Sequence, residues 1–289
     1  MADQRVFADL HVHSTASDGL LSPRELLARA REAGVSVLGL TDHDTLRGVP
    51  EGLSAAEETG VRLIPGIELS CGWPTSDVSL HVVGLFVDHR APALIDLLDR
   101  QQKLRHVRAL KILDRLAELH IDVEPLRQRF QAESDRVLGR PHVARFLQEI
   151  GVVKEFQEAF HRYLARGRPA YVQKEHVLPE EGITAIQGAG GLAIIAHPGL
   201  HPHWKQVWAE VDSLPWDGLE VYYSEHTPQH IEFFSRIARD RGLAFSGGSD
   251  YHGEYGKHTN RLGLYGIGED LFRDLEHRAS ERLSEEKRK

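Results

Sequence analysis

Histidines and carboxylates recur in short motifs whose residue types could bind metal ions. In His11-Val12-His13, alternation along an extended segment places both imidazoles on the same side, where they could hold one ion. Imidazole combined with carboxylate is the ligand mix that suits zinc, manganese or iron. The candidate ligands are His11, His13, Asp18, His43, Glu68, His81, His197, Asp250 and His252.

These ligands are too many for a single ion and, with Glu68 as a bridge, suit a cluster of two or three. Asp42 and Asp44 flank His43, where they are either loop residues or hydrogen-bond partners that orient its imidazole. A metal-bound water or a partner residue such as Asp42 could protonate a leaving group. Glu68, Asp42 and Asp250 are therefore the expected catalytic residues.

The elements that must position these residues follow an alternating β/α pattern. Ser22 as N-cap, Pro23 as first helical residue and Glu25 as the end of a capping box predict a helix to about residue 33. A second helix is expected near 52–59. Alternation of strands and helices over 289 residues predicts an α/β fold with a mostly parallel sheet, and favours a barrel. The seven strand-like runs are 6–10, 35–40, 62–67, 80–87, 192–196, 219–222 and 243–246.

The candidate ligands fall at the ends of six of these runs, nearly always just after the apolar residues; His81 instead opens its run. In a β/α barrel the carboxyl ends of the strands converge on one face, so these residues would share one site. Each motif alone is weak, because His-X-His pairs are common and His197 or Asp250 could simply cap a strand or turn. Their coincidence predicts a metal site. His226 and His230 lie four residues apart but are expected at a solvated helix start near Pro228.

The middle of the chain breaks the alternation. Residues 91–167 show helical patterning and no strand run, with helices expected at 141–150 and 154–164. This predicts a barrel formed by 1–90 and 168–289, with 91–167 as a helical insertion. The highly charged stretch 269–289 is expected to be a surface helix.

The ordered motifs resemble the signature of the PHP (polymerase and histidinol phosphatase) superfamily. They are His-X-His with a following Asp-Gly, Thr41-Asp42-His43-Asp44, Gly66-Ile67-Glu68, a strand histidine, Ala196-His197-Pro198 and a closing Asp-X-His. The resemblance implies a distorted (β/α)7 barrel with three metals. One would be held by His11, His13, Glu68 and Asp250, another by Glu68, His81 and His197, and the third by Asp18, His43 and His252.

The insertion resembles that of a set of bacterial PHP phosphoesterases. The motifs are Arg105-His106-Val107-Arg108, Gly139-Arg140-Pro141-His142 and 163–167 followed by Tyr171-Val172. The set includes RNase AM, a 5′ to 3′ exonuclease on short RNA, and nucleoside 3′,5′-bisphosphate phosphatases. The resemblance implies that the insertion covers the metal site and contacts substrate. The residues expected to hold its phosphate groups are Arg105, Arg108, Arg140 and His142, since guanidinium groups match phosphate oxygens in pairs.

The expected reaction is hydrolysis of nucleotide phosphate esters by a metal-activated hydroxide. Mn²⁺ is the expected metal, with Zn²⁺, Fe²⁺ or Mg²⁺ as alternatives. The substrates would be nucleoside 3′,5′-bisphosphates or 5′-phosphorylated short RNA, releasing phosphate or mononucleotides. Alternatives are a histidinol-phosphate phosphatase or other small-molecule phosphomonoesterase, an amidohydrolase barrel, and a non-catalytic PHP interaction module. All nine ligands are present, which disfavours the last.

Composition bounds the partners and the compartment. A net charge of −8 disfavours broad binding of duplex DNA, which needs a basic face. No apolar stretch approaches the length of a membrane span, and no signal peptide is recognised, so no membrane association is expected. Cys71 is the single cysteine and cannot form an internal disulfide. The cytoplasm is the expected compartment, and no obligate protein partner is inferred.

Overall fold

The computed structural model describes residues 6–73, 79–132, 139–173, 175, 177–201, 204–253 and 261–286. The chain divides into two compact units. The first comprises Met1–Leu97 with Val177–Lys289, and the second is Leu98–His176. The second unit thus begins and ends several residues later than the 91–167 insertion expected from the sequence.

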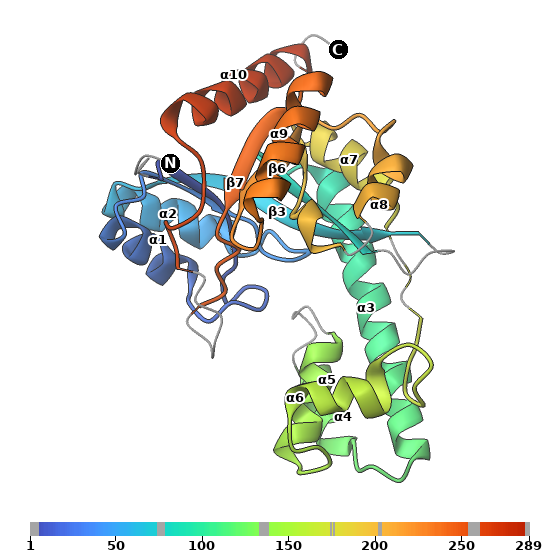
Figure 1. Cartoon of the computed structure of the whole chain (residues 1–289). Helices are drawn as coiled ribbons and strands as arrows, with labels where there is room; N and C mark the ends of the chain where they lie inside the picture. The colour runs from blue at the N-terminus through green and yellow to red at the C-terminus, as the bar shows by residue number, and fades with distance from the viewer. Residues whose placement is uncertain are drawn as a thin grey trace. The chain divides into compact units, whose positions relative to one another are not determined.

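The first unit is built on a seven-stranded sheet, of which β3, β6 and β7 are labelled in Figure 1. The strands are ordered as in the chain, from β1 to β7. Most neighbours are parallel, but β4 is antiparallel to both β3 and β5. This departs from simple β/α alternation and explains why His81 opens its strand: the start of β4 lies at the edge where the parallel strands end. The strands are β1 (Ala8–Val12), β2 (Val37–Leu40), β3 (Arg62–Gly72), β4 (Ser79–Leu85), β5 (Leu192–Ile195), β6 (Gly218–Tyr223) and β7 (Ala244–Gly248).

The two ends of the sheet approach each other and nearly close a barrel. The N–H of Asp250 donates to the carbonyl of His11 at 2.8 Å, and the N–H of His13 donates to the carbonyl of Tyr251 at 2.9 Å. Gly248 permits this approach, because a Cβ there would lie 2.4 Å from the Cβ of His11. The predicted barrel of seven strands is therefore confirmed in nearly closed form.

The helices of the first unit surround this sheet (Figure 1). The capping box of Ser22 and Glu25 is confirmed at the start of α1. The second helix begins earlier than its predicted start at residue 52. The helices are α1 (Pro23–Glu32), α2 (Val49–Thr59), α7 (Pro179–Gly188), α8 (Trp204–Val211), α9 (Pro228–Arg241) and α10 (Glu269–Glu286), with a short 3₁₀ turn η2 (Pro198–Leu200).

The second unit is helical, as its patterning predicts. It contains most of α3 (Pro92–Glu118), then α4 (Glu124–Ala132), α5 (Arg140–Glu149), α6 (Phe156–Ala159) and a π-helical turn η1 (Phe160–Leu164). These elements bury their own apolar cluster, which includes Leu113, Phe146 and Leu147. The unit therefore has a hydrophobic core separate from that of the sheet.

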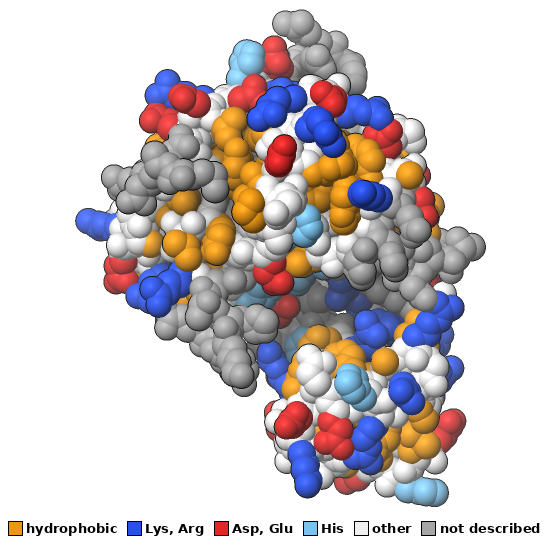
Figure 2. Space-filling view, viewed as in Figure 1, with side chains coloured by type: hydrophobic (Ala, Val, Ile, Leu, Met, Phe, Trp, Pro, Cys, Tyr) orange, Lys and Arg blue, Asp and Glu red, His pale blue; other side chains and the backbone are white. Residues whose placement is uncertain are grey.

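The surface carries interspersed positive and negative side chains on the face seen in Figure 2. Within the described part of the chain, none of the helices has the length and apolar character needed to cross a membrane.

Candidate metal centre

The nine predicted ligands meet at one edge of the sheet and form what we call the histidine–carboxylate cluster. They are contributed by the ends of β1, β2, β5 and β7, by the loops that follow, by the start of β4 and by the interior of β3. The sequence predicts that the third strand ends at residue 67, but β3 continues to Gly72. Glu68 therefore lies within a strand, in the part that pairs with β4.

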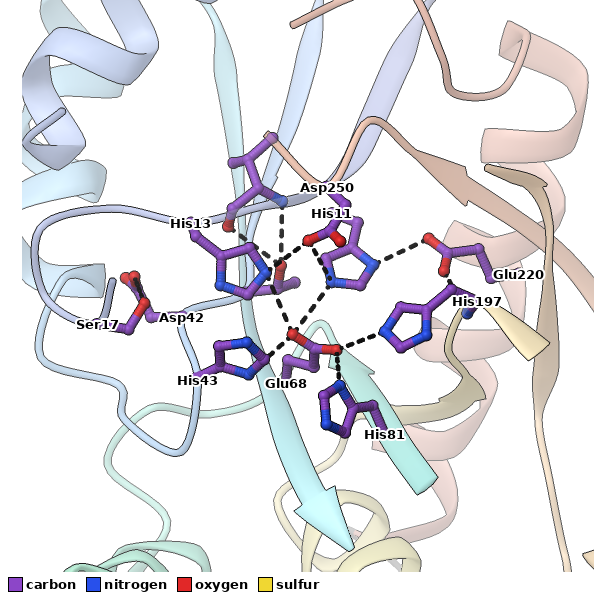
Figure 3. Close-up of polar contacts among 12 residues, drawn as sticks. His11, His13, Ser17, Asp42, His43, Glu68, His81, His197, Glu220 and Asp250 are labelled. Atoms are coloured by element: carbon purple, nitrogen blue, oxygen red, sulfur yellow. Dashed lines mark hydrogen bonds and ion pairs between the residues drawn. The ribbon is translucent and has the colours of Figure 1, made fainter. Parts of the chain in front are cut away.

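Glu68 is the centre of the cluster (Figure 3). Its side chain is only 1% exposed, and both carboxylate oxygens face imidazoles. Oε1 lies 2.7 Å from Nδ1 of His81 and 2.9 Å from Nε2 of His197. Oε2 lies within 3.0–3.3 Å of nitrogens of His43, His13 and His11. One carboxylate thus contacts five histidines, which is the position expected of a bridging ligand.

The ligand atoms form three overlapping groups that could each hold an ion. One group has the same four residues as the first metal site implied by the resemblance. His43 belongs to two groups, whereas His197 belongs to none of the three and reaches the cluster through its contact with Glu68 and its ring contacts with His11 and His81. The groups are His11, His13, Glu68 and Asp250; His13, Asp18, His43 and His252; and His43, Glu68 and His81.

Several buried ligand atoms lack a hydrogen bond, including Nε2 of His11, both ring nitrogens of His13 and Oε2 of Glu68. Buried polar atoms are normally hydrogen-bonded, so such a concentration calls for an explanation. Nε2 of His13 lies 3.1 Å from Oδ1 of Asp250. Donor atoms around one ion at bonds of about 2.1 Å lie ~3.0–3.4 Å apart. The spacing and the donor types therefore fit divalent metal ions.

The charges of the cluster keep its carboxylates ionised. Burial would raise the pKa of Glu68, but His43, His81 and His11 lower it well below its usual range. Burial would likewise raise the pKa of Asp250, and His11 and His13 lower it well below the usual value. For His81, burial lowers the pKa to about 4 despite the opposing effect of Glu68. For His11, burial also lowers the pKa, but Glu220, Glu68 and Asp250 outweigh it and raise the pKa well above its usual value. Ionised carboxylates and neutral imidazoles are the forms that bind metals.

The cluster extends from a buried floor to a solvent-exposed rim. His11 and His13 are almost completely buried. At the rim, the side chains of Asp18 and His252 are 42% and 35% exposed, and Nε2 of His252 lies 3.3 Å from Oδ1 of Asp18. The cluster is therefore open to solvent on the side of Asp18 and His252.

Backbone strain is concentrated at this site. Among the described residues, five non-glycine residues have positive φ, and three of them are Asp44 (51°), His197 (28°) and Asp250 (52°). Each such conformation costs on the order of 1–3 kcal/mol and persists only where surrounding contacts enforce it. Strained backbone conformations therefore occur at two candidate ligands, His197 and Asp250, and at Asp44, which follows the candidate ligand His43.

Asp42 does not join the cluster, although the sequence places it among the catalytic candidates. Its carboxylate accepts hydrogen bonds from the N–H and hydroxyl of Ser14, each at 2.7 Å, and from the hydroxyl of Ser17 at 2.7 Å. Asp44 similarly accepts from the N–H and hydroxyl of Ser70. Asp42 thus positions the loop after β1, and Asp44 holds Ser70 of β3.

Two residues at the cluster were not identified from the sequence. Glu220 of β6 contacts the ring of His11, with Oε1 3.0 Å from Nδ1. The hydroxyl of Tyr223 donates to Oδ2 of Asp250 at 2.8 Å. A charged residue inside an otherwise apolar strand was the available signal for Glu220.

The expectation of a solvated His226 is wrong. Its ring is 8% exposed, and it packs against Tyr223 and Phe234 with centroids 5.2 and 5.1 Å away. His230 is half-buried and closes the capping box of α9 with Thr227. His226 is a structural residue beside the site.

The predicted substrate-binding residues all lie in the second unit, where three arginines are close enough to affect one another. Burial, together with the positive charges of Arg140 and Arg105, lowers the pKa of Arg108 to about 10. Nε of Arg108 donates to the carbonyl of Val172 at 2.9 Å. His142 accepts from the N–H of Gly139 at the start of α5. Arginines that lie close together despite their like charges provide the positive charge and the N–H donors that an anion needs.

Comparisons with known proteins identify relatives and solved structures that align with most of this chain. A relative from Haemophilus influenzae, named 5′-3′ exoribonuclease, is 41% identical over 84% of this chain and 89% of its own length. A 3′,5′-nucleoside bisphosphate phosphatase from Chromobacterium violaceum is 34% identical over 93% of this chain and 96% of its own. A solved structure from Chromobacterium violaceum, described as an amidohydrolase with bound sulfate and no metal, superposes with a TM-score of 0.79. It is 31% identical and covers 94% of this chain and 96% of the other. The model of the PHP domain matches residues 9–168, and the chain therefore belongs to the PHP family.

Proposed function

We propose that the protein is a metal-dependent phosphoesterase that hydrolyses nucleoside 3′,5′-bisphosphates and 5′-phosphorylated short RNA, the latter as a 5′ to 3′ exonuclease. The observation that carries the proposal is the histidine–carboxylate cluster, in which one buried carboxylate contacts five imidazoles. The named activities of two relatives that align over most of this chain support the substrate class. These names also disfavour the histidinol-phosphate, amide and non-catalytic alternatives.

We assign two or three divalent ions to the cluster, with Mn²⁺ as the favoured metal. His11, His13, Glu68 and Asp250 would hold one ion, and Glu68 with His81 and either His43 or His197 a second. Asp18, His43 and His252 would complete a third with His13. When bound, such ions supply an activated water and neutralise charge on the phosphoryl oxygens.

Side chains of the protein would retain the metals, position the ligands and bind the substrate. Glu68 and Asp250 contribute the negative charge that retains the metals, and Tyr223 and Glu220 hold Asp250 and His11 in place. Arg105, Arg108 and Arg140, with His142, would bind the phosphate groups of the substrate. We assign Asp42 to positioning the loop after β1, because the hydrogen bonds of its carboxylate within the described part of the chain are all to Ser14 and Ser17.

The proposal is tested with purified protein loaded with Mn²⁺. We expect phosphate release from adenosine 3′,5′-bisphosphate and mononucleotide release from a 5′-phosphorylated short RNA. A chelated sample and Glu68→Gln are the controls. Glu68→Gln removes the charge that bridges the ligand groups, so turnover should fall by about 10³-fold or more, which is ~4 kcal/mol of transition-state stabilisation.

Two results would contradict the proposal in different ways. Much faster turnover of histidinol phosphate would show that the substrate class is wrong. Metal binding without hydrolysis of any of these substrates would support a non-catalytic module. Elemental analysis of the protein as purified identifies the metals and their number.

A further inference from the structure

Glu220 contacts two different histidines of the cluster with its two carboxylate oxygens. It lies in β6, the one strand from which no ligand is predicted, and is 2% exposed. Oε1 lies 3.0 Å from Nδ1 of His11, and Oε2 accepts the backbone N–H of His197 at 2.6 Å. A buried carboxylate is costly unless both oxygens are satisfied, so these two contacts account for its presence.

An irregularity in β6 lets this strand send two polar side chains to the cluster. The pairing of β6 with β7 shifts register between Glu220 and Tyr222. In a regular strand, residues 220 and 223 would point to opposite faces. A bulge inserts one extra residue and changes that alternation. Glu220 and Tyr223 accordingly both contact cluster residues.

The contact to His11 determines which ring nitrogen faces the cluster. An ionised carboxylate only accepts hydrogen bonds, so Nδ1 of His11 must carry the proton. When the ring is neutral, as metal binding requires, Nε2 then carries the lone pair. It is buried without a hydrogen bond, 3.3 Å from Oε2 of Glu68 and 3.5 Å from Oδ1 of Asp250.

The contact between Glu220 and His197 involves the backbone of His197 and not its ring. His197 has φ 28° and ψ 53°, a left-handed conformation that non-glycine residues rarely adopt. Its N–H is held by Oε2 of Glu220, and its ring reaches Oε1 of Glu68 at 2.9 Å. The buried carboxylate thus helps to enforce the strained turn that delivers this imidazole.

We propose that Glu220 is a positioning residue that orients His11 and His197 together and thereby sets the metal affinity of the cluster. The inference rests on the proposed metal-dependent function. Loss of Glu220 would weaken binding at two places in the cluster, although the residue itself contacts no ion.

The first test is the Mn²⁺ affinity of Glu220→Gln, measured by competition with a metal-binding dye. An amide offers one acceptor oxygen and two N–H donors, so it can satisfy His11 Nδ1–H or His197 N–H, but not both. Replacement of such a partner lowers metal affinity by about 10–100-fold. Ser246→Ala is the matched control, because Ser246 pairs with Glu220 across the β6–β7 ladder and is equally buried at 2% exposure.

Ser246→Ala should bind Mn²⁺ like the wild type. An unchanged affinity in a folded Glu220→Gln protein would overturn the inference. If the wild type binds no divalent metal, the proposed function itself fails, which is a distinguishable result.

The second test needs no variant at position 220. Nitrogen-15 NMR of histidine-labelled wild type loaded with Zn²⁺, which is diamagnetic, reports which nitrogen of His11 is protonated. His11→Asn identifies the signal. We expect a proton on Nδ1 that exchanges slowly with solvent; a proton on Nε2 would refute the positioning role even if Glu220→Gln fails to fold.

Discussion

Asp42, in the loop after β2, holds Ser14, in the loop after β1, through two hydrogen bonds of 2.7 Å, one from the N–H and one from the hydroxyl. Ser14 directly follows His13, and Ser17, which also donates to Asp42, directly precedes Asp18. The carboxylate therefore ties down the segment between two predicted ligands. We therefore propose that Asp42 sets the geometry of this loop and does not transfer a proton.

Asp42→Asn should destabilise the protein by about 1–3 kcal/mol, because an amide cannot accept from all three donors. If Asp42 only positions the loop, turnover of a substrate with a good leaving group, such as p-nitrophenyl phosphate, should fall as much as turnover of a nucleotide. Urea unfolding and paired kinetics measure both effects. A loss confined to the nucleotide would instead identify Asp42 as the general acid.

Tyr223→Phe removes the hydroxyl that donates to Oδ2 of Asp250. Burial and the charge of Asp250 raise the pKa of Tyr223, so the phenol remains a donor at all ordinary pH values. The variant should lose about tenfold in Mn²⁺ affinity with little change in thermal stability, because one oriented ligand is freed. Tyr222→Phe, at the neighbouring half-buried position, is the control and should bind metal normally; equal losses in both variants would contradict the assignment.

The grouping of the candidate ligands could be predicted because metal binding needs few residue types and the barrel places such residues at strand ends. His11 and His13 alternate along an extended segment, and the start of α1 carries a complete capping box at Ser22. Local rules of this kind are visible in a single stretch of sequence.

What escaped prediction depends on contacts between distant strands. That Tyr223 reaches the cluster as well as Glu220 depends on the register shift between Glu220 and Tyr222 in the pairing of β6 with β7. The antiparallel direction of β4 is set by its pairing with β3 and β5, and the burial of His226 by the packing of α9. Periodicity within one segment carries no information on these relationships.

Arg140→Ala should raise the KM for adenosine 3′,5′-bisphosphate and leave kcat nearly unchanged, since we place Arg140 in substrate binding. Loss of one charge-assisted contact costs about 1.5–3 kcal/mol, or roughly 10–100-fold in KM. Arg140 is half-buried, and burial lowers the pKa of its guanidinium. Steady-state kinetics at saturating Mn²⁺ separate the two constants.

Arg129→Ala is the matched control for this measurement. Arg129 lies in the same unit but is exposed and paired with Glu149 at 2.9 Å. Its loss should leave KM unchanged. A lowered kcat with an unchanged KM in Arg140→Ala would place this arginine in the chemical step instead.

His226 predicts a pH dependence of stability that is separate from metal binding. Its Nδ1–H donates to the carbonyl of Val221 at 2.9 Å, and Nε2 accepts the N–H of Gly199 at 3.1 Å, so the folded protein needs a neutral ring. Burial lowers the pKa of His226, as do the nearby His230 and His197. The stabilisation is therefore complete above the unfolded-state pKa of about 6.5 and is lost as pH falls towards the lower folded-state value.

His226→Asn isolates this contribution in metal-free protein, because the other histidines are common to both proteins. At pH 7.5 the variant should be less stable by about 1–3 kcal/mol, since the donor of Gly199 loses its acceptor. The difference in free energy of unfolding, measured in urea, should shrink between pH 7 and pH 5, as protonation removes the same acceptor from the wild type. A difference that stays constant over this range would mean that His226 is not held neutral by the fold.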